Sequence, residues 1–127
     1  MALKAELLRE PSLTESALSK ALPAAADFMG LNQKESAEIL GLSATKTSLM
    51  WNKKYELDST NKVEWQMAVL FFRLYRSLGS IVGSAEGART WLRGFNSELG
   101  AAPFEKLTSL EGLVDVVKYL DGQVNSR

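Results

Sequence analysis

The sequence predicts an all-α fold, and two observations carry this prediction. Apolar residues recur in several segments at the three-and-four spacing of an amphipathic helix, and no segment of useful length shows the alternation of a β-strand. Proline, glycine and helix-capping residues divide the 127 residues into helices joined by short turns. We expect an N-terminal helix-turn-helix bundle, a long central helix and a small C-terminal helical domain.

Residues 1–30 are rich in Ala, Leu, Glu and Lys, which favour helices, and they are interrupted by Pro11 and Pro23. Proline is tolerated in the first turn of a helix but removes a hydrogen bond in its interior. We therefore expect short helices separated at the prolines. Pro23 is expected to open a helix over residues 24–29, which Gly30 ends.

Residues 31–56 have the outline of a helix-turn-helix. Two short helical patterns flank the tripeptide Gly41-Leu42-Ser43. The glycine can adopt positive φ at the turn, and the serine can cap the second helix. Ala37 supplies the small residue that the first helix needs where the two helices cross.

Residues 59–79 predict one long amphipathic helix. Asn61 and Glu64 have the spacing of a capping box at its start. We place the boundary between an N-terminal region, residues 1–79, and a C-terminal domain, residues 80–127, at the end of this helix.

Three apolar residues of the long helix, Trp65, Val69 and Phe72, lie off its main apolar stripe. The helix is therefore apolar on more than one face. Two interpretations are equally open. The three residues form a dimerisation surface for a second copy, or the helix is wrapped on all sides by its own domain.

The rest of the chain predicts two further helices joined by a loop. Ser84 can cap the first, which ends at Gly94, and Ser109 can cap the second, which ends at Gly122. Residues 96–103 between them are typical of a loop.

Composition excludes most classes of enzyme. The chain has no cysteine and no histidine, so it lacks thiolate nucleophiles, the commonest general base and the commonest metal ligand. No phosphate loop, dinucleotide-binding glycine pattern or nucleophile elbow is present in the sequence. We expect a non-enzymatic protein without metal or cofactor.

Charge and hydropathy restrict the partners. Fifteen basic and fifteen acidic residues give zero net charge, so any contact with nucleic acid must be local. No apolar run approaches the roughly 20 residues needed to span a bilayer, and the N-terminus has no signal-peptide core. We expect a soluble, cytoplasmic protein with no membrane partner.

The segment from Gln33 to Ser43 closely resembles the first half of an Xre/Cro-type helix-turn-helix. The resemblance implies that the second helix, about residues 44–54, enters the major groove of DNA. Two residues depart from the usual pattern, since Thr47 replaces an apolar branched residue and Leu49 offers no hydrogen bond where arginine is common. Side chains on the outer face would meet base edges, and lysines would meet phosphates. The predicted DNA contacts are Gln33, Ser43, Thr45, Lys46, Ser48, Leu49, Asn52 and Lys53.

The C-terminal half has a second recognisable layout. It contains Ala88-Arg89-Thr90-Trp91-Leu92-Arg93, then Asn96, then Leu99-Gly100-Ala101-Ala102-Pro103, and then a helix with Gly112 and spaced valine and leucine. This layout resembles the C-terminal domain of the Xre/MbcA/ParS antitoxin family, and together with the helix-turn-helix the resemblance covers residues 22–124. Ala101 stands where the family turn has a second glycine, and Gly94-Phe95 stands where Thr-Pro is more usual.

This resemblance implies an antitoxin that silences a toxin by direct contact, commonly a RES-domain toxin that destroys NAD. Repression of its own operon would require a homodimer, because one module of this size contacts too few bases for operator specificity. We also expect a higher toxin–antitoxin complex. Aromatic and polar groups around the loop after Trp91 are of the kind that protein interfaces favour. The predicted toxin contacts are Trp91, Arg93, Asn96, Glu98, Leu99, Gln123 and Arg127.

The same residues are compatible with three alternatives. The helix-turn-helix can be an ordinary helical hairpin, or a vestigial one in an antitoxin that binds only protein. The chain can also be a phage-repressor-like transcriptional regulator without a toxin partner, although such a regulator has no need of the layout from Trp91 to Leu120.

Overall fold

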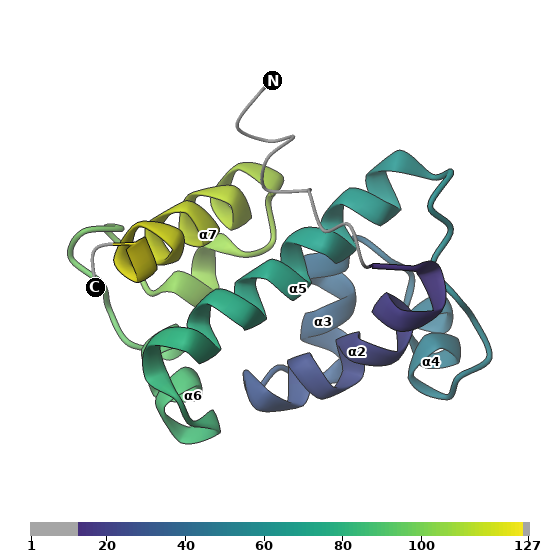
Figure 1. Ribbon diagram of the computed structural model, residues 1–127, viewed down its shortest axis with the longest axis horizontal. Helices are drawn as coiled ribbons and strands as arrows, with labels where there is room; N and C mark the ends of the chain where they lie inside the picture. Colours follow the sequence, from purple (N-terminus) through teal and green to yellow (C-terminus); the bar gives the residue numbers. More distant parts are fainter. Residues whose placement is uncertain (1–12, 126–127) are drawn as a thin grey trace.

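The computed structural model describes residues 13–125, and this part of the chain is built from helices (Figure 1). In chain order the elements are α2 (Glu15–Phe28), α3 (Gln33–Leu40), α4 (Ala44–Trp51), α5 (Lys62–Val82), α6 (Ala85–Arg93), the 3₁₀ helix η1 (Pro103–Lys106) and α7 (Leu110–Asn125). The described residues form no strand, and they make one isolated β-bridge, between Asn96 and Ala101. The predicted all-α class is confirmed.

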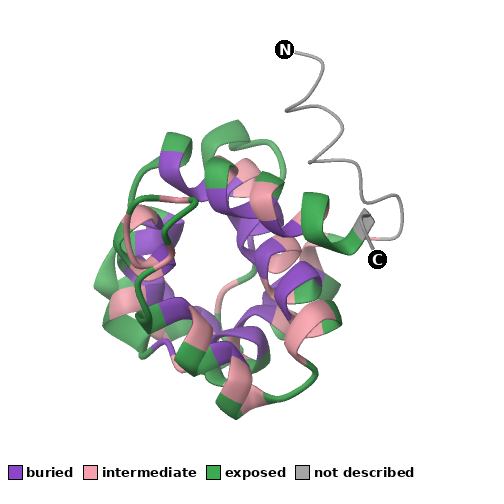
Figure 2. Ribbon diagram, turned by 90° about the vertical axis from the view of Figure 1, so that its left-hand side faces the viewer, coloured by how far each residue is buried: buried purple, intermediate pink, exposed green. Residues whose placement is uncertain are grey.

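Helix α5 is the centre of the molecule (Figure 1). Helices α2 and α3 pack against it toward one end, and α6 and α7 toward the other. Its side chains Leu70, Phe71, Leu74 and Leu78 have no exposed surface. Burial of one such side chain contributes about 1.5–3 kcal/mol, so α5 supplies a large part of the core. Figure 2 shows buried segments facing the inside of the bundle and exposed ones facing outward.

The apolar core runs without a break from Leu18 in α2 to Leu120 in α7. Packing therefore marks no gap at the predicted boundary between residues 79 and 80. This boundary lies inside α5 and not at its end, because the helix continues to Val82. The division into two domains stays a prediction. No described helix is both long enough and apolar enough to be a membrane span.

Helix α2 differs from the prediction. It begins after Thr14, which caps it, and Pro23 lies in its interior, so the prediction that Pro23 opens a helix is wrong. Proline removes one backbone hydrogen bond, to the carbonyl of Ser19. The helix continues because one face is held in the core by Leu18, Leu22, Ala25 and Ala26. Gly30 follows the helix at φ +68°, whereas Pro11 lies outside the described residues.

The predicted turn between two short helices is present. Asn32 Oδ1 accepts a hydrogen bond from Glu35 N at 2.7 Å, and Glu35 Oε1 accepts one from Asn32 N at 3.0 Å, so a complete capping box starts α3. Gly41 ends α3 at φ +71°, a left-handed conformation that favours glycine. Ser43 Oγ then accepts a hydrogen bond from Lys46 N at 3.0 Å and starts α4.

Helix α5 begins after Asn61, whose Oδ1 accepts a hydrogen bond from Glu64 N at 3.2 Å. The predicted capping box is only half formed, because the Glu64 carboxylate does not return to the Asn61 backbone. It is instead buried against the residues that connect α4 to α5.

Helices α6 and α7 begin after the predicted serines, Ser84 and Ser109. Helix α7 continues past Gly122 to Asn125, so the predicted stop at Gly122 is wrong. The last turns are held against α5 by the buried side chain of Leu120 and by a 2.6 Å hydrogen bond from Ser77 Oγ to Asp121 Oδ1.

Candidate functional site

Helix α4 carries the predicted DNA-reading face. Thr45, Leu49 and Asn52 are exposed, whereas Thr47 and Met50 point into the core. Thr47 has no exposed surface, and its Oγ1 donates to the Ser43 carbonyl oxygen at 2.9 Å. The polar atom is therefore satisfied at a position that usually holds an apolar branched residue.

Three other predicted DNA contacts, Ser48, Asn52 and Gln33, differ in their exposure and contacts. Ser48 is half-buried, and its carbonyl oxygen accepts a hydrogen bond from Asn52 Nδ2 at 2.9 Å. The Asn52 amide nitrogen therefore contacts its own helix. Gln33 is exposed at the start of α3, where it lines a shallow groove of about 340 Å³ between α3 and α4.

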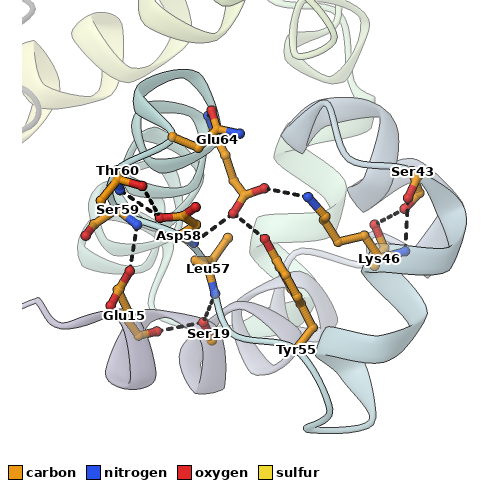
Figure 3. Close-up of polar contacts among 12 residues, drawn as sticks. Glu15, Ser19, Ser43, Lys46, Tyr55, Leu57, Asp58, Ser59, Thr60 and Glu64 are labelled. Carbon is orange, nitrogen blue, oxygen red and sulfur yellow. Dashed lines mark hydrogen bonds and ion pairs between the residues drawn. The ribbon is translucent and has the colours of Figure 1, made fainter.

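Lys46 points toward α5 and away from the outer face of α4 (Figure 3). Its Nζ lies 3.2 Å from Glu64 Oε1 and 5.0 Å from the centre of the Tyr55 ring. The hydrogen bond to Glu64 raises the pKa of Lys46 above its ordinary value. This placement does not favour the predicted phosphate contact of Lys46, because its ammonium is already paired.

Glu64 is the acceptor on which these contacts meet (Figure 3). The residue is 5% exposed, and its carboxylate accepts from Tyr55 Oη at 2.6 Å, from Asp58 N at 2.8 Å and from Lys46 Nζ at 3.2 Å. Burial, the largest single influence, raises the pKa of Glu64, but the hydrogen bonds from Tyr55, Asp58 and Lys46 outweigh it. The pKa is lowered below its ordinary value.

Two further hydrogen bonds tie the connector between α4 and α5 to α2 (Figure 3). Leu57 N donates to Ser19 Oγ at 2.8 Å, and Ser59 N donates to Glu15 Oε2 at 2.7 Å. The connector that follows α4 is thus fixed on two sides, by α2 and by α5.

The three residues predicted to form a dimer surface differ in exposure. Val69 is 1% exposed and belongs to the core of its own chain. Trp65 and Phe72 are half-buried and pack against that core. They keep some surface for a second copy, so dimerisation through them stays a prediction.

The loop over residues 94–102, which we call the 94–102 loop, joins α6 to η1. Asn96 shapes it: Oδ1 of this residue accepts from Glu98 N at 2.9 Å and from Leu99 N at 3.1 Å. Gly100 has φ +74°, which explains the first glycine of the turn. Ala101 has no positive φ, so alanine in place of the second glycine causes no strain.

Phe95 is the most exposed large apolar residue of this loop, at 75%. Sequence reasoning placed it near the toxin site but not among the contacts. Its position between Gly94 and Asn96, outside any helical stripe, was the available signal.

Arg93, a predicted toxin contact, is exposed but also makes several contacts within the chain. Its Nη2 donates to the two Glu35 carboxylate oxygens at 3.1 and 3.2 Å and to the Gly30 carbonyl oxygen at 3.2 Å. Its guanidinium also lies 3.8 Å from the centre of the Phe104 ring. Arg93 therefore joins α6 to the start of α3, and it packs between the two predicted functional regions.

The other predicted toxin contacts surround the loop. Trp91 is half-buried and stacks on Tyr119 of α7, with 6.2 Å between ring centres. Glu98 is exposed and accepts a hydrogen bond from Tyr119 Oη at 3.4 Å, and Leu99 is half-buried. Gln123 is exposed near the end of α7, and Arg127 lies outside the described residues.

Gly112 allows η1 to approach the start of α7. A Cβ added at this glycine would lie 2.0 Å from the carbonyl oxygen of Lys106, which is closer than any side chain permits. This close approach and the salt bridge of 3.6 Å between Lys106 Nζ and Asp115 Oδ2 hold η1, which follows the 94–102 loop, against α7.

The fold and these contacts define an all-α protein in which a helix-turn-helix and a loop-bearing helical segment share one central helix. Residues 77–123, from the last turns of α5 to the last turns of α7, match the family model of the antitoxin Xre/MbcA/ParS C-terminal toxin-binding domain. The resemblance predicted for the C-terminal half is confirmed. A search of curated proteins found no match to the chain.

Proposed function

We propose that this protein is the cytoplasmic antitoxin of a type II toxin–antitoxin system, and that the 94–102 loop with its flanking helices binds and inhibits the toxin. The toxin that we propose is an enzyme of the RES type, which degrades NAD. The match of residues 77–123 to a toxin-binding domain is the observation on which this proposal rests.

Phe95 is the anchor that we propose for this contact. Aromatic side chains often supply much of the binding energy of an interface, and Phe95 is 75% exposed. The hydrogen bonds of Asn96 hold the loop in one shape before the partner arrives. Less conformational entropy is then lost on binding than with a flexible loop.

The experiment is co-expression with the enzyme encoded beside this chain, followed by purification of the complex and an assay of NAD consumption. We expect the chain to bind the enzyme and to stop NAD loss. Phe95→Ser should raise the Kd about 30-fold, the effect of losing an interface anchor worth about 2 kcal/mol.

Val63→Ser is the matched control for Phe95→Ser. Val63 is 71% exposed, but it lies at the start of α5 and outside the matched segment. The Val63→Ser variant should bind the toxin with the same Kd as the unchanged chain. Failure to form any complex contradicts the proposal, and equal losses in the two variants show that Phe95 is not the anchor.

A second activity, binding of operator DNA, is favoured by the exposed outer face of α4. We propose that a homodimer, paired through Trp65 and Phe72, places two α4 helices in successive major grooves about 34 Å apart. A gel-shift with the DNA upstream of the gene, at low salt and with or without toxin, tests this activity. A shift that a scrambled duplex does not compete away supports it. Absence of such a shift in both mixtures shows that the helix-turn-helix is vestigial.

A further inference from the structure

The residue that follows helix α4 and its cap has a left-handed backbone conformation, which favours glycine, but it is a lysine. Lys53 N donates to the Met50 carbonyl oxygen at 3.1 Å, and Lys54 N donates to the Leu49 carbonyl oxygen at 2.7 Å. This pair of bonds is a Schellman motif, in which the residue after the cap is left-handed and is usually glycine. Here that residue is Lys53, at φ +63°, and among the described residues it alone has positive φ without being glycine.

The strained lysine lies beside another one from a distant part of the chain. Lys53 and Lys20 of α2 line the same cavity of about 230 Å³, whose walls include Trp51 and Tyr55. Lys54 is the next residue along the chain and is also exposed. Among the residues lining this cavity, Glu56 is the one carboxylate.

The lysines here differ from Lys46, which is paired with Glu64. Within the described part of the chain, neither Lys20 nor Lys53 makes an ion pair or a side-chain hydrogen bond. Three lysines therefore accompany one carboxylate at the end of the recognition helix, in a chain of zero net charge. An anionic partner with repeated charges fits this surface better than a single small anion.

We infer that Lys20, Lys53 and Lys54 form a contact site for the phosphates of a nucleic-acid backbone, beside the base-reading face of α4. This inference rests on the proposed DNA binding. It assigns the phosphate contacts to Lys20, Lys53 and Lys54 and not to Lys46. Backbone strain that persists in a fold is often connected with function. A phosphate contact of the Lys53 ammonium group accounts for a lysine at this left-handed position, where glycine would fit the backbone better.

The variant Lys53→Gly tests this inference, because it should raise the stability of the chain and lower its affinity for DNA. The melting temperature should rise by about 3 °C, because glycine relieves the strain at positive φ. Affinity for DNA should fall by a similar factor for operator and scrambled duplexes. The slope of log affinity against log salt should fall in magnitude by about 0.9, the value for one lost phosphate contact.

Two further variants complete the experiment. Lys20→Ala should lower the salt slope by a similar amount. Lys118→Ala removes one exposed charge from α7, at the other end of the molecule from α4 (Figure 1), and should leave the salt slope unchanged.

The outcomes separate this inference from the operator proposal. If the unchanged chain binds both duplexes equally at low salt and Lys53→Gly weakens both, operator recognition fails but the phosphate site stands. If the operator is bound specifically and Lys53→Gly keeps its affinity and its salt slope, the phosphate site is overturned. Absence of binding to either duplex at low salt also overturns it.

Discussion

The two ends of the molecule are held together by different kinds of contact. At the helix-turn-helix end, side chains fix the connector between α4 and α5: Glu64 accepts three hydrogen bonds, and Ser19 accepts one from Leu57 N. At the C-terminal end, backbone atoms approach closely, because Gly112 leaves room for the carbonyl group of Lys106. The first arrangement should respond to pH and to loss of charge. The second should respond to added volume.

The largest effect is expected from Gly112→Ala. The new Cβ would lie 2.0 Å from the Lys106 carbonyl oxygen, so η1 or α7 must shift. The free energy of unfolding should fall by roughly 3 kcal/mol, the upper end of typical overpacking costs. Urea denaturation followed by circular dichroism measures this change.

Gly122→Ala is the matched control, because it makes the same substitution in the same helix. Apart from its own helical backbone and chain neighbours, no atom of the described residues lies within 4 Å of a Cβ added there. This variant should be more stable than the unchanged chain by up to about 1 kcal/mol, since alanine favours a helix over glycine. A loss of stability equal to that of Gly112→Ala would mean that close approach is not the cause.

An intermediate effect is expected from Glu64→Gln, which tests the side-chain contacts of the other end. The amide can still accept hydrogen bonds but loses its charge, so the free energy of unfolding at neutral pH should fall by about 1–2 kcal/mol. The denaturant midpoint in urea measures this change.

The pH dependence of the same variant has a definite sign. The pKa of Glu64 is lowered in the folded chain below its ordinary value of 4.5, so the folded state binds this proton less readily than the unfolded state does. The stability from Glu64 is complete above that ordinary value and is lost as the pH falls through the folded pKa. Glu64→Gln should therefore lose less stability than the unchanged chain in this acidic range. Equal acid sensitivity of the two proteins would contradict the role given to Glu64.

The smallest effect is expected from Thr47→Val. This residue is completely buried, and valine has nearly the same shape. The Ser43 carbonyl oxygen keeps the hydrogen bond from the backbone N of residue 47 at 3.0 Å after the hydroxyl is lost. The unfolding free energy should change by no more than about 0.5 kcal/mol, because no buried polar group is left without a partner. A larger loss, seen in the urea midpoint, would show that the hydroxyl itself holds the turn.

Local signals allowed much of the fold to be predicted. Gly41 acts through its own backbone conformation, and Ser43, Ser84 and Ser109 each cap a backbone N three residues further along the chain, so their roles follow from the sequence alone. Pro23 was predicted wrongly because packing of the α2 core face outweighs one missing hydrogen bond.

The ion-pair partners of charged side chains could not be predicted from neighbouring residues in the sequence. Lys46 was predicted as a DNA contact beside the outer face of a helix, and Arg93 as a toxin contact beside the loop after Trp91. Glu64 and Glu35 lie near them only in the folded chain. Val69 was likewise named as a candidate dimer contact, and in the folded chain it is only 1% exposed. Such contacts depend on how helices far apart in the sequence are packed.

The position of α5 has a consequence for folding cooperativity. Both the helix-turn-helix and the segment matched to a toxin-binding domain pack on this one helix, within a single continuous core. Neither end can unfold completely without exposing apolar surface of the other. A partner that binds only the native chain at one end therefore raises the unfolding free energy of the other end as well, by an amount that grows with its concentration. Its departure would remove this added stability from both ends of the chain together.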